Sequence, residues 1–105
     1  MQTLTFHFDT AAASRGTTQS ALVGVVASGN LEVLAERVLA ASTCEVTVAT
    51  PVTGFDAVWQ EVVSDVVART SPGGLRLSIN DGGARPDTVT LRLMQVIQTM
   101  EMRDA

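Results

Sequence analysis

One amphipathic segment, residues 53–74, constrains the fold more than any other stretch. Its apolar side chains recur every three or four residues, the spacing of one helix face; they are Phe55, Val58, Trp59, Val62, Val63, Val66 and Val67. Thr53 with Asp56 predicts a capping box at the helix start, and Arg69 before Pro72-Gly73-Gly74 predicts its end. A helix with one apolar stripe needs a second layer to pack against.

Segments with strand periodicity supply that layer. Residues 2–8 and 44–50 alternate between polar and apolar side chains, which predicts two strands. Pro51 ends the second of them, because proline cannot extend a hydrogen-bonded ladder. Residues 75–81 follow the helix and place Leu75, Leu77 and Ile79 on one face of a further strand.

A hairpin is predicted between residues 21 and 38. Residues 21–27 are apolar on both faces and rich in valine, which predicts a strand in the middle of a sheet. Residues 31–38 fit a second strand or a short helix, and the short link through Gly29 favours the hairpin. The small, polar residues 9–20 before it predict a loop.

The C-terminal segment fits two structures at its start. Residues 86–91 alternate like a strand, but over a longer window Val89, Leu93, Val96, Ile97 and Met100 fit a helix, and Pro86 suits a first helical turn. We favour the helix. The fold class is then α+β, a mainly antiparallel sheet with two helices packed on one face, within a single domain of residues 1–105.

Charge and cysteine content limit the partners. The formal net charge is −4 and the isoelectric point about 4.7, which argues against nucleic acid and suits docking on basic protein surfaces. The single cysteine excludes an internal disulfide, and we expect a cytoplasmic location. Neither a signal peptide nor a membrane-spanning stretch is recognisable, so no membrane partner is expected.

The residue types that enzymes use for catalysis are sparse. His7 is the only histidine and lies on a strand face with threonines, which predicts an ordinary surface residue. Cys44 opens a strand without a neighbouring cation, which predicts a buried structural thiol. The glycine pairs at 73–74 and 82–83 match neither phosphate-loop nor dinucleotide spacing.

The paired carboxylates also lack an obvious catalytic arrangement. Asp81 and Asp87 flank a turn, and Glu61 and Asp65 lie one helical turn apart; both pairs are predicted to be solvated charges. No metal site and no catalytic residue is expected. The domain therefore either binds something or has something attached to it.

Two segments carry a family resemblance. Residues 21–36, ALVGVVASGNLEVLAE, resemble the delta, or acyl carrier, subunit of bacterial malonate decarboxylase, where Ser-Gly-Asp-Leu-Glu-Val follows a valine-rich strand. Residues 75–95, LRLSINDGGARPDTVTLRLMQ, resemble the late strand, Asn-Asp-x-Gly-Ala turn and C-terminal helix of that family. The acyl carrier subunit of citrate lyase is similar more distantly.

The resemblance implies one functional residue. Ser28 would bear a covalent 2'-(5''-phosphoribosyl)-3'-dephospho-CoA prosthetic group through a phosphodiester. Asn30 departs from the aspartate common in the family, which removes a charge but keeps a turn-forming side chain. A turn would project Ser28 to a modifying enzyme, and Gly29 removes a side chain that would block its approach.

The same resemblance implies the partners. The group's thiol would carry acetyl and malonyl thioesters between a malonate/acetyl transferase subunit and the decarboxylase subunits, after a prosthetic-group transferase has modified Ser28. The chain itself would be a non-catalytic carrier. Two alternatives stay open: a carrier for a citrate-type lyase, and a non-catalytic interaction module that pairs through a strand edge.

Overall fold

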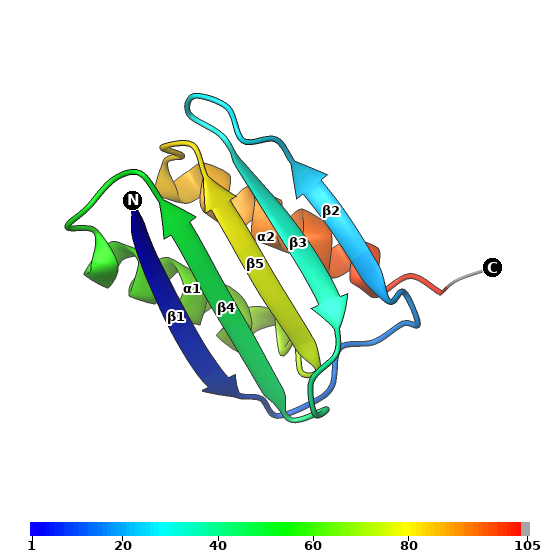
Figure 1. Ribbon diagram of the computed structural model, residues 1–105. Helices are drawn as coiled ribbons and strands as arrows, with labels where there is room; N and C mark the ends of the chain where they lie inside the picture. Colours follow the sequence, from blue (N-terminus) through cyan, green and yellow to red (C-terminus); the bar gives the residue numbers. More distant parts are fainter. Residues whose placement is uncertain (104–105) are drawn as a thin grey trace.

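Five strands form one sheet with two helices behind it in residues 1–103, the part of the chain that the computed structural model describes (Figure 1). The strands are β1 (Gln2–Asp9), β2 (Ser20–Gly24), β3 (Leu31–Arg37), β4 (Thr43–Thr50) and β5 (Leu75–Asp81), and the helices are α1 (Asp56–Thr70) and α2 (Pro86–Met100). The sheet order is β1-β4-β5-β3-β2. The predicted α+β class, with both helices on one face, is confirmed.

Strand β5 is the central strand of the sheet. It pairs in parallel with β4 and antiparallel with β3. Parallel neighbours need a crossover connection, and α1 supplies it between β4 and β5. The remaining pairs, β1 with β4 and β2 with β3, are antiparallel. The chain then passes from the end of β5 through a short turn into α2.

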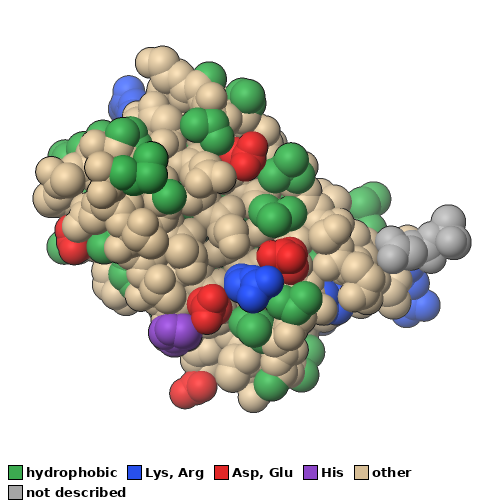
Figure 2. Space-filling model, in the orientation of Figure 1, with side chains coloured by type: hydrophobic (Ala, Val, Ile, Leu, Met, Phe, Trp, Pro, Cys, Tyr) green, Lys and Arg blue, Asp and Glu red, His purple; other side chains and the backbone are tan. Residues whose placement is uncertain are grey.

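The core lies between the sheet and the helices. Every second residue of β3, β4 and β5 is buried there, whereas alternate residues of the edge strands β1 and β2 are only partly buried. The fully buried side chains with the largest volumes include Leu31, Leu75, Leu77, Ile79, Leu93, Ile97 and Met100. The opposite face of the sheet is open and polar. Figure 2 shows charged side chains across it, where His7 pairs with Glu45 and Arg76 with Glu36.

The prediction that residues 21–27 form a central strand is wrong. Strand β2 is an edge strand, it ends at Gly24, and Leu22 is 60% exposed. Gly24 has a φ of +88° and packs against the Leu31 carbonyl, so the chain leaves the sheet there. Valine content favours strand structure but does not distinguish a central from an edge position. The predicted hairpin is confirmed, because β2 pairs with β3.

The start of α1 also differs from its prediction. Phe55, and not Thr53, is the N-cap residue, and no side chain caps this helix. Phe55 is half exposed and lies outside the core. The helix ends at Thr70 because Ser71 takes up a left-handed φ of 48° and donates its N–H to the Val67 carbonyl.

Helix α2 is confirmed over residues 86–100, so the ambiguous residues 86–91 are helical. Pro86 stands in its first turn. Neither helix within residues 1–103 combines the length and apolar character that a membrane crossing requires.

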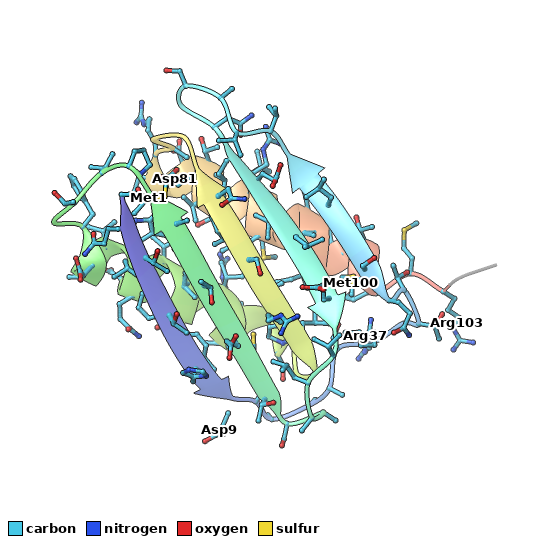
Figure 3. All side chains as sticks on the ribbon, in the orientation of Figure 1. Met1, Asp9, Arg37, Asp81, Met100 and Arg103 are labelled. Atoms are coloured by element: carbon cyan, nitrogen blue, oxygen red, sulfur yellow. The ribbon has the colours of Figure 1, made fainter. Side chains whose placement is uncertain are left out.

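One arginine makes several of the hydrogen bonds that hold the loop between β1 and β2. The Arg37 guanidinium donates hydrogen bonds to backbone carbonyls of this loop and of the end of α2, namely those of Ser14, Arg15, Thr18 and Met100. Figure 3 shows Arg37 beside Met100 at the end of the molecule opposite Asp81. Loop and helix are thus joined by charge-assisted bonds.

Candidate functional site

Ser28 lies at the tip of the β2–β3 connection, residues 25–30, here called the Ser28 loop. The Asn30 N–H donates to the Ala27 carbonyl at 2.9 Å, which closes a four-residue turn with Ser28 and Gly29 at its centre. Gly29 has a φ of +76°, a value that suits glycine at the third position of a type II turn. Ser28 is exposed, and its hydroxyl makes no hydrogen bond within the described residues.

The turn that follows β5 is hydrogen-bonded to the Ser28 loop. The Gly29 N–H donates to the Gly82 carbonyl at 3.0 Å, and the Gly82 N–H donates to the Asn30 carbonyl at 2.8 Å. A Cβ atom at Gly82 would overlap the Ala27 carbonyl. The two backbones can therefore approach this closely only because residue 82 is glycine. In Figure 1 the two turns stand at the same end of the sheet.

Asn30 joins the loop to α2. Its Oδ1 accepts one hydrogen bond from the Leu31 N–H at 2.8 Å and another from Arg92 Nε at 3.2 Å. Arg92 also donates to Gln95 at 2.9 Å. A carboxylate oxygen could accept the same two bonds, so the asparagine keeps the contacts while leaving the Arg92 charge without a carboxylate partner in residues 1–103.

The surroundings of Ser28 leave room for another molecule. A Cβ atom built on Gly29 would meet no atom within 4 Å. Val25 and Val26 are 56% and 51% exposed. Figure 2 shows hydrophobic side chains over this end of the molecule, both on the β2–β3 connection and over the segment that joins β4 to α1. An approaching protein would meet an exposed hydroxyl surrounded by apolar surface.

The two residues with the most reactive side-chain types lie elsewhere. His7 is exposed on β1 and contacts Glu45 at 3.5 Å, so the predicted surface histidine is confirmed. Cys44 is buried on β4, which confirms the predicted structural thiol. Burial, with a smaller contribution from Glu45, raises the pKa of Cys44 to about 12. A thiol of this kind is a poor nucleophile at neutral pH.

The prediction of a solvated Asp81 is wrong. Asp81 is buried, its Oδ2 accepts a hydrogen bond from the Thr50 hydroxyl, and its Oδ1 accepts one from the Ala84 N–H, each at 2.8 Å. Its position at the end of a central strand, which the spacing alone does not reveal, explains the burial. Asp87 is exposed, as predicted.

The second carboxylate pair is as predicted. Glu61 and Asp65 are exposed on α1, and Asp65 pairs with Arg69 at 3.2 Å. Residues 1–103 contain no cluster of three or more His, Cys, Asp or Glu that could hold a metal ion.

Gly82 and Arg92 are the site residues that sequence reasoning missed. The glycine pair 82–83 indicates a turn, but its contact with the Ser28 loop depends on sheet order. Arg92 lies 62 residues from Asn30 along the chain, and no local pattern joins them. Around Ser28 the structure provides an exposed hydroxyl on a hydrogen-bonded backbone turn, and the side chain of the next but one residue, Asn30, contacts the Arg92 cation.

Comparison with known proteins agrees with this architecture. Residues 18–100 match the family described as malonate decarboxylase delta subunit (MdcD). The malonate decarboxylase acyl carrier protein of Bradyrhizobium diazoefficiens is 53% identical over 100 residues, covering 95% of each chain. That of Xanthomonas euvesicatoria is 47% identical over 105 residues, covering all of both chains.

A solved structure shares the fold as well. The crystal structure of a Pseudomonas malonate decarboxylase hetero-tetramer in complex with malonate contains a chain with 37% sequence identity and a TM-score of 0.83, which covers 95% of this chain and 99% of that one. The chain described here belongs to the malonate decarboxylase delta-subunit family of acyl carrier proteins.

Proposed function

We propose that Ser28 is the attachment residue of this acyl carrier, and that the group attached is 2'-(5''-phosphoribosyl)-3'-dephospho-CoA. One observation carries the proposal: the Ser28 hydroxyl is exposed and unpaired within residues 1–103, while the backbone around it is fixed by three hydrogen bonds. Serine is a weak nucleophile, so a prosthetic-group transferase must reach and activate it. The open space at Gly29 allows that approach.

The residues near Ser28 suit a phosphate-linked group. Arg92 is held at Asn30, whose Cα lies within about 7 Å of that of Ser28 because the two residues are two positions apart along the chain. Its guanidinium has no carboxylate partner in residues 1–103, so its charge is available to attract a phosphodiester carried by the same loop. Guanidinium and phosphate attract strongly in partly buried settings.

The chain supplies positioning, and its partners supply the chemistry. When bound, the group provides a thiol on which acetyl or malonyl forms a thioester, whose carbonyl stabilises the negative charge left by decarboxylation. The Ser28 loop holds the attachment oxygen outside the sheet, so the group moves between partners from a fixed origin. The Asp81 carboxylate accepts hydrogen bonds from Thr50 and Ala84, and His7 lies on the open face of the sheet, so we assign neither residue an acid or base role at Ser28.

The proposed partners are the malonate/acetyl transferase subunit, the decarboxylase subunits and the prosthetic-group transferase. The exposed valines of the Ser28 loop offer them apolar contact, and the net charge of −4 favours basic docking surfaces. We also propose that the chain acts as one carrier domain. We place it in the cytoplasm, because thiols such as the free Cys44 stay reduced there.

Co-expression with the modifying enzymes tests the attachment residue. The wild-type chain is expected to gain the mass of the prosthetic group, and Ser28→Ala to gain none. Ser42→Ala is the matched control, because Ser42 is also an exposed serine in a turn. Modification of Ser28→Ala to the wild-type extent would refute the assignment.

A further inference from the structure

A cavity of about 280 Å³ opens between the N-terminal ends of α1 and α2. Its walls are mainly aromatic and aliphatic, with one polar edge; the residues that matter below are Phe55, Val58, Trp59, Asp81, Gly83 and Ala84. Phe55 is 50% exposed at the rim, whereas Trp59 is buried deeper. Figure 3 shows Asp81 at the end of β5, on the side where the Ser28 loop stands.

The cavity adjoins the proposed attachment site. Gly29 of the Ser28 loop is hydrogen-bonded to Gly82, and the next residue, Gly83, lines the cavity. The Gly29 N–H follows directly after Ser28, and the Gly82 carbonyl comes directly before Gly83. The hydrogen bond between them therefore holds the Cα atoms of Ser28 and Gly83 within about 9 Å of each other. A Cβ atom at Gly83 would meet nothing within 4 Å, so the surface between loop and cavity is open there.

The size and the lining of the cavity favour a ligand with a flat, uncharged ring. At about 280 Å³ it is near the lower limit of ligand sites, roughly 300 Å³, and suits one ring system better than a long chain. Aromatic side chains stack well on nucleobases. Each Asp81 oxygen accepts one hydrogen bond within the protein, so each retains acceptor capacity for an amino group such as adenine N6.

We propose that this cavity binds the adenosine part of the group carried on Ser28. The inference rests on the proposed function. In that group one phosphate and two sugars separate the Ser28 oxygen from the adenine, which is long enough to span the roughly 9 Å from Ser28 to Gly83 at the edge of the cavity. A malonyl carboxylate would be disfavoured against these apolar walls. If the adenosine is held between the helices, only the pyrophosphate and pantetheine portions move. The distance that the thiol can reach is then measured from the cavity and not from Ser28.

Trp59 reports directly on occupancy, because it is the only tryptophan of the chain and lines the cavity. The modified chain is expected to show quenched Trp59 emission relative to the unmodified chain. Soluble 3'-dephospho-CoA added to the unmodified chain should quench it too, whereas pantetheine should not. Phe55→Ala should weaken 3'-dephospho-CoA binding at least about fivefold, from the loss of one stacking contact.

Leu91→Ala is the matched control, since Leu91 is 51% exposed on α2 and does not line the cavity. Its binding should equal that of the wild type. A chain modified on Ser28 whose Trp59 emission is unchanged overturns the adenosine site and leaves the Ser28 assignment standing. Quenching only after a partner subunit is added would assign the cavity to a partner side chain instead. Absence of modification would count against the assignment of Ser28. The 3'-dephospho-CoA titration would still show whether the cavity binds adenosine.

Discussion

Cys44 shows how a single residue couples burial to pH. Its folded-state pKa is raised to about 12 from an ordinary value of 9.0, so the folded chain binds more protons than the unfolded chain between these values. The free energy of unfolding must therefore fall as pH rises from about 9 to about 12, by up to about 1.4 kcal/mol per pH unit. Below pH 9 the thiol is protonated in both states, so none of this loss of stability has yet occurred.

No lysine or tyrosine side chain titrates alongside Cys44 between pH 9 and pH 12, because the chain contains neither residue. Urea unfolding at pH 8 and pH 11 is expected to show the loss in the wild type. Cys44→Ala should be less stable at pH 8, because a buried side chain is truncated, but should show a much flatter pH profile. An equally steep decline in Cys44→Ala would show that another group is responsible.

Predictions for single residues succeeded where the local strand pattern determines whether a side chain is exposed or buried. His7 and Cys44 have the environments that their strand positions indicate. Asp81 does not, because its burial depends on β5 being central and on a hydroxyl from Thr50, 31 residues away along the chain. Long-range partners of this kind leave no local pattern in a sequence.

At the scale of elements, the Ser28 loop depends on the turn beneath it. Gly82→Ala would force the two turns apart, because the new Cβ would overlap backbone atoms of the loop. We expect weaker protection of the Gly29 amide against hydrogen exchange and slower modification of Ser28. Stability should fall by about 1–3 kcal/mol, the usual range for a forced overlap in packed structure.

Gly83→Ala separates this steric effect from backbone strain. Gly83 has a φ of +89° but open space around its Cβ position, so the substitution should cost about 1–2 kcal/mol through strain alone. The Gly29 amide should keep its protection. Equal loss of protection in both variants would contradict the proposed support of the loop by Gly82.

The elements themselves were predictable to differing degrees. Alternation identified β1, β4 and β5, and helical spacing identified α1 and α2, because each pattern reflects one buried face. The edge position of β2 was not predictable, since valines occur in central and edge strands alike. The N-cap of α1 is Phe55 and not Thr53, and no side chain caps the helix, so the capping pattern did not indicate the true helix start.

Over the whole molecule, Arg37 joins parts that are distant in sequence. Its guanidinium links the loop between β1 and β2 to the end of α2 through backbone carbonyls. Arg37→Ala should lower the free energy of unfolding by about 2–4 kcal/mol, because partly buried charge-assisted bonds are lost. The loop should become more sensitive to proteolysis, as checked by limited digestion and urea unfolding.

Arg76→Ala is the control for the loss of an arginine. Arg76 pairs with Glu36 on the open face of the sheet at 3.3 Å and is 41% exposed, so its removal should cost no more than about 1 kcal/mol. If the two variants were equally destabilised, the contacts of Arg37 would not be the cause.

Sheet order explains why the candidate site was only partly predictable. The family resemblance singled out Ser28, and the short link through Gly29 predicted the hairpin that carries it. The support by Gly82 and the contact of Arg92 with Asn30 arise only once β5 lies beside β3 and α2 crosses behind them. Local sequence therefore indicated where a group could be attached, but not what holds that point in place.

Fragment mass spectrometry of the modified chain tests the central proposal most directly. Tryptic cleavage after Arg15 and Arg37 releases residues 16–37, which contain Ser20 and Ser28 as their only serines. Fragment ions are expected to place the whole prosthetic group on Ser28. Fragments that place it on Ser20, or on a peptide without Ser28, would contradict it.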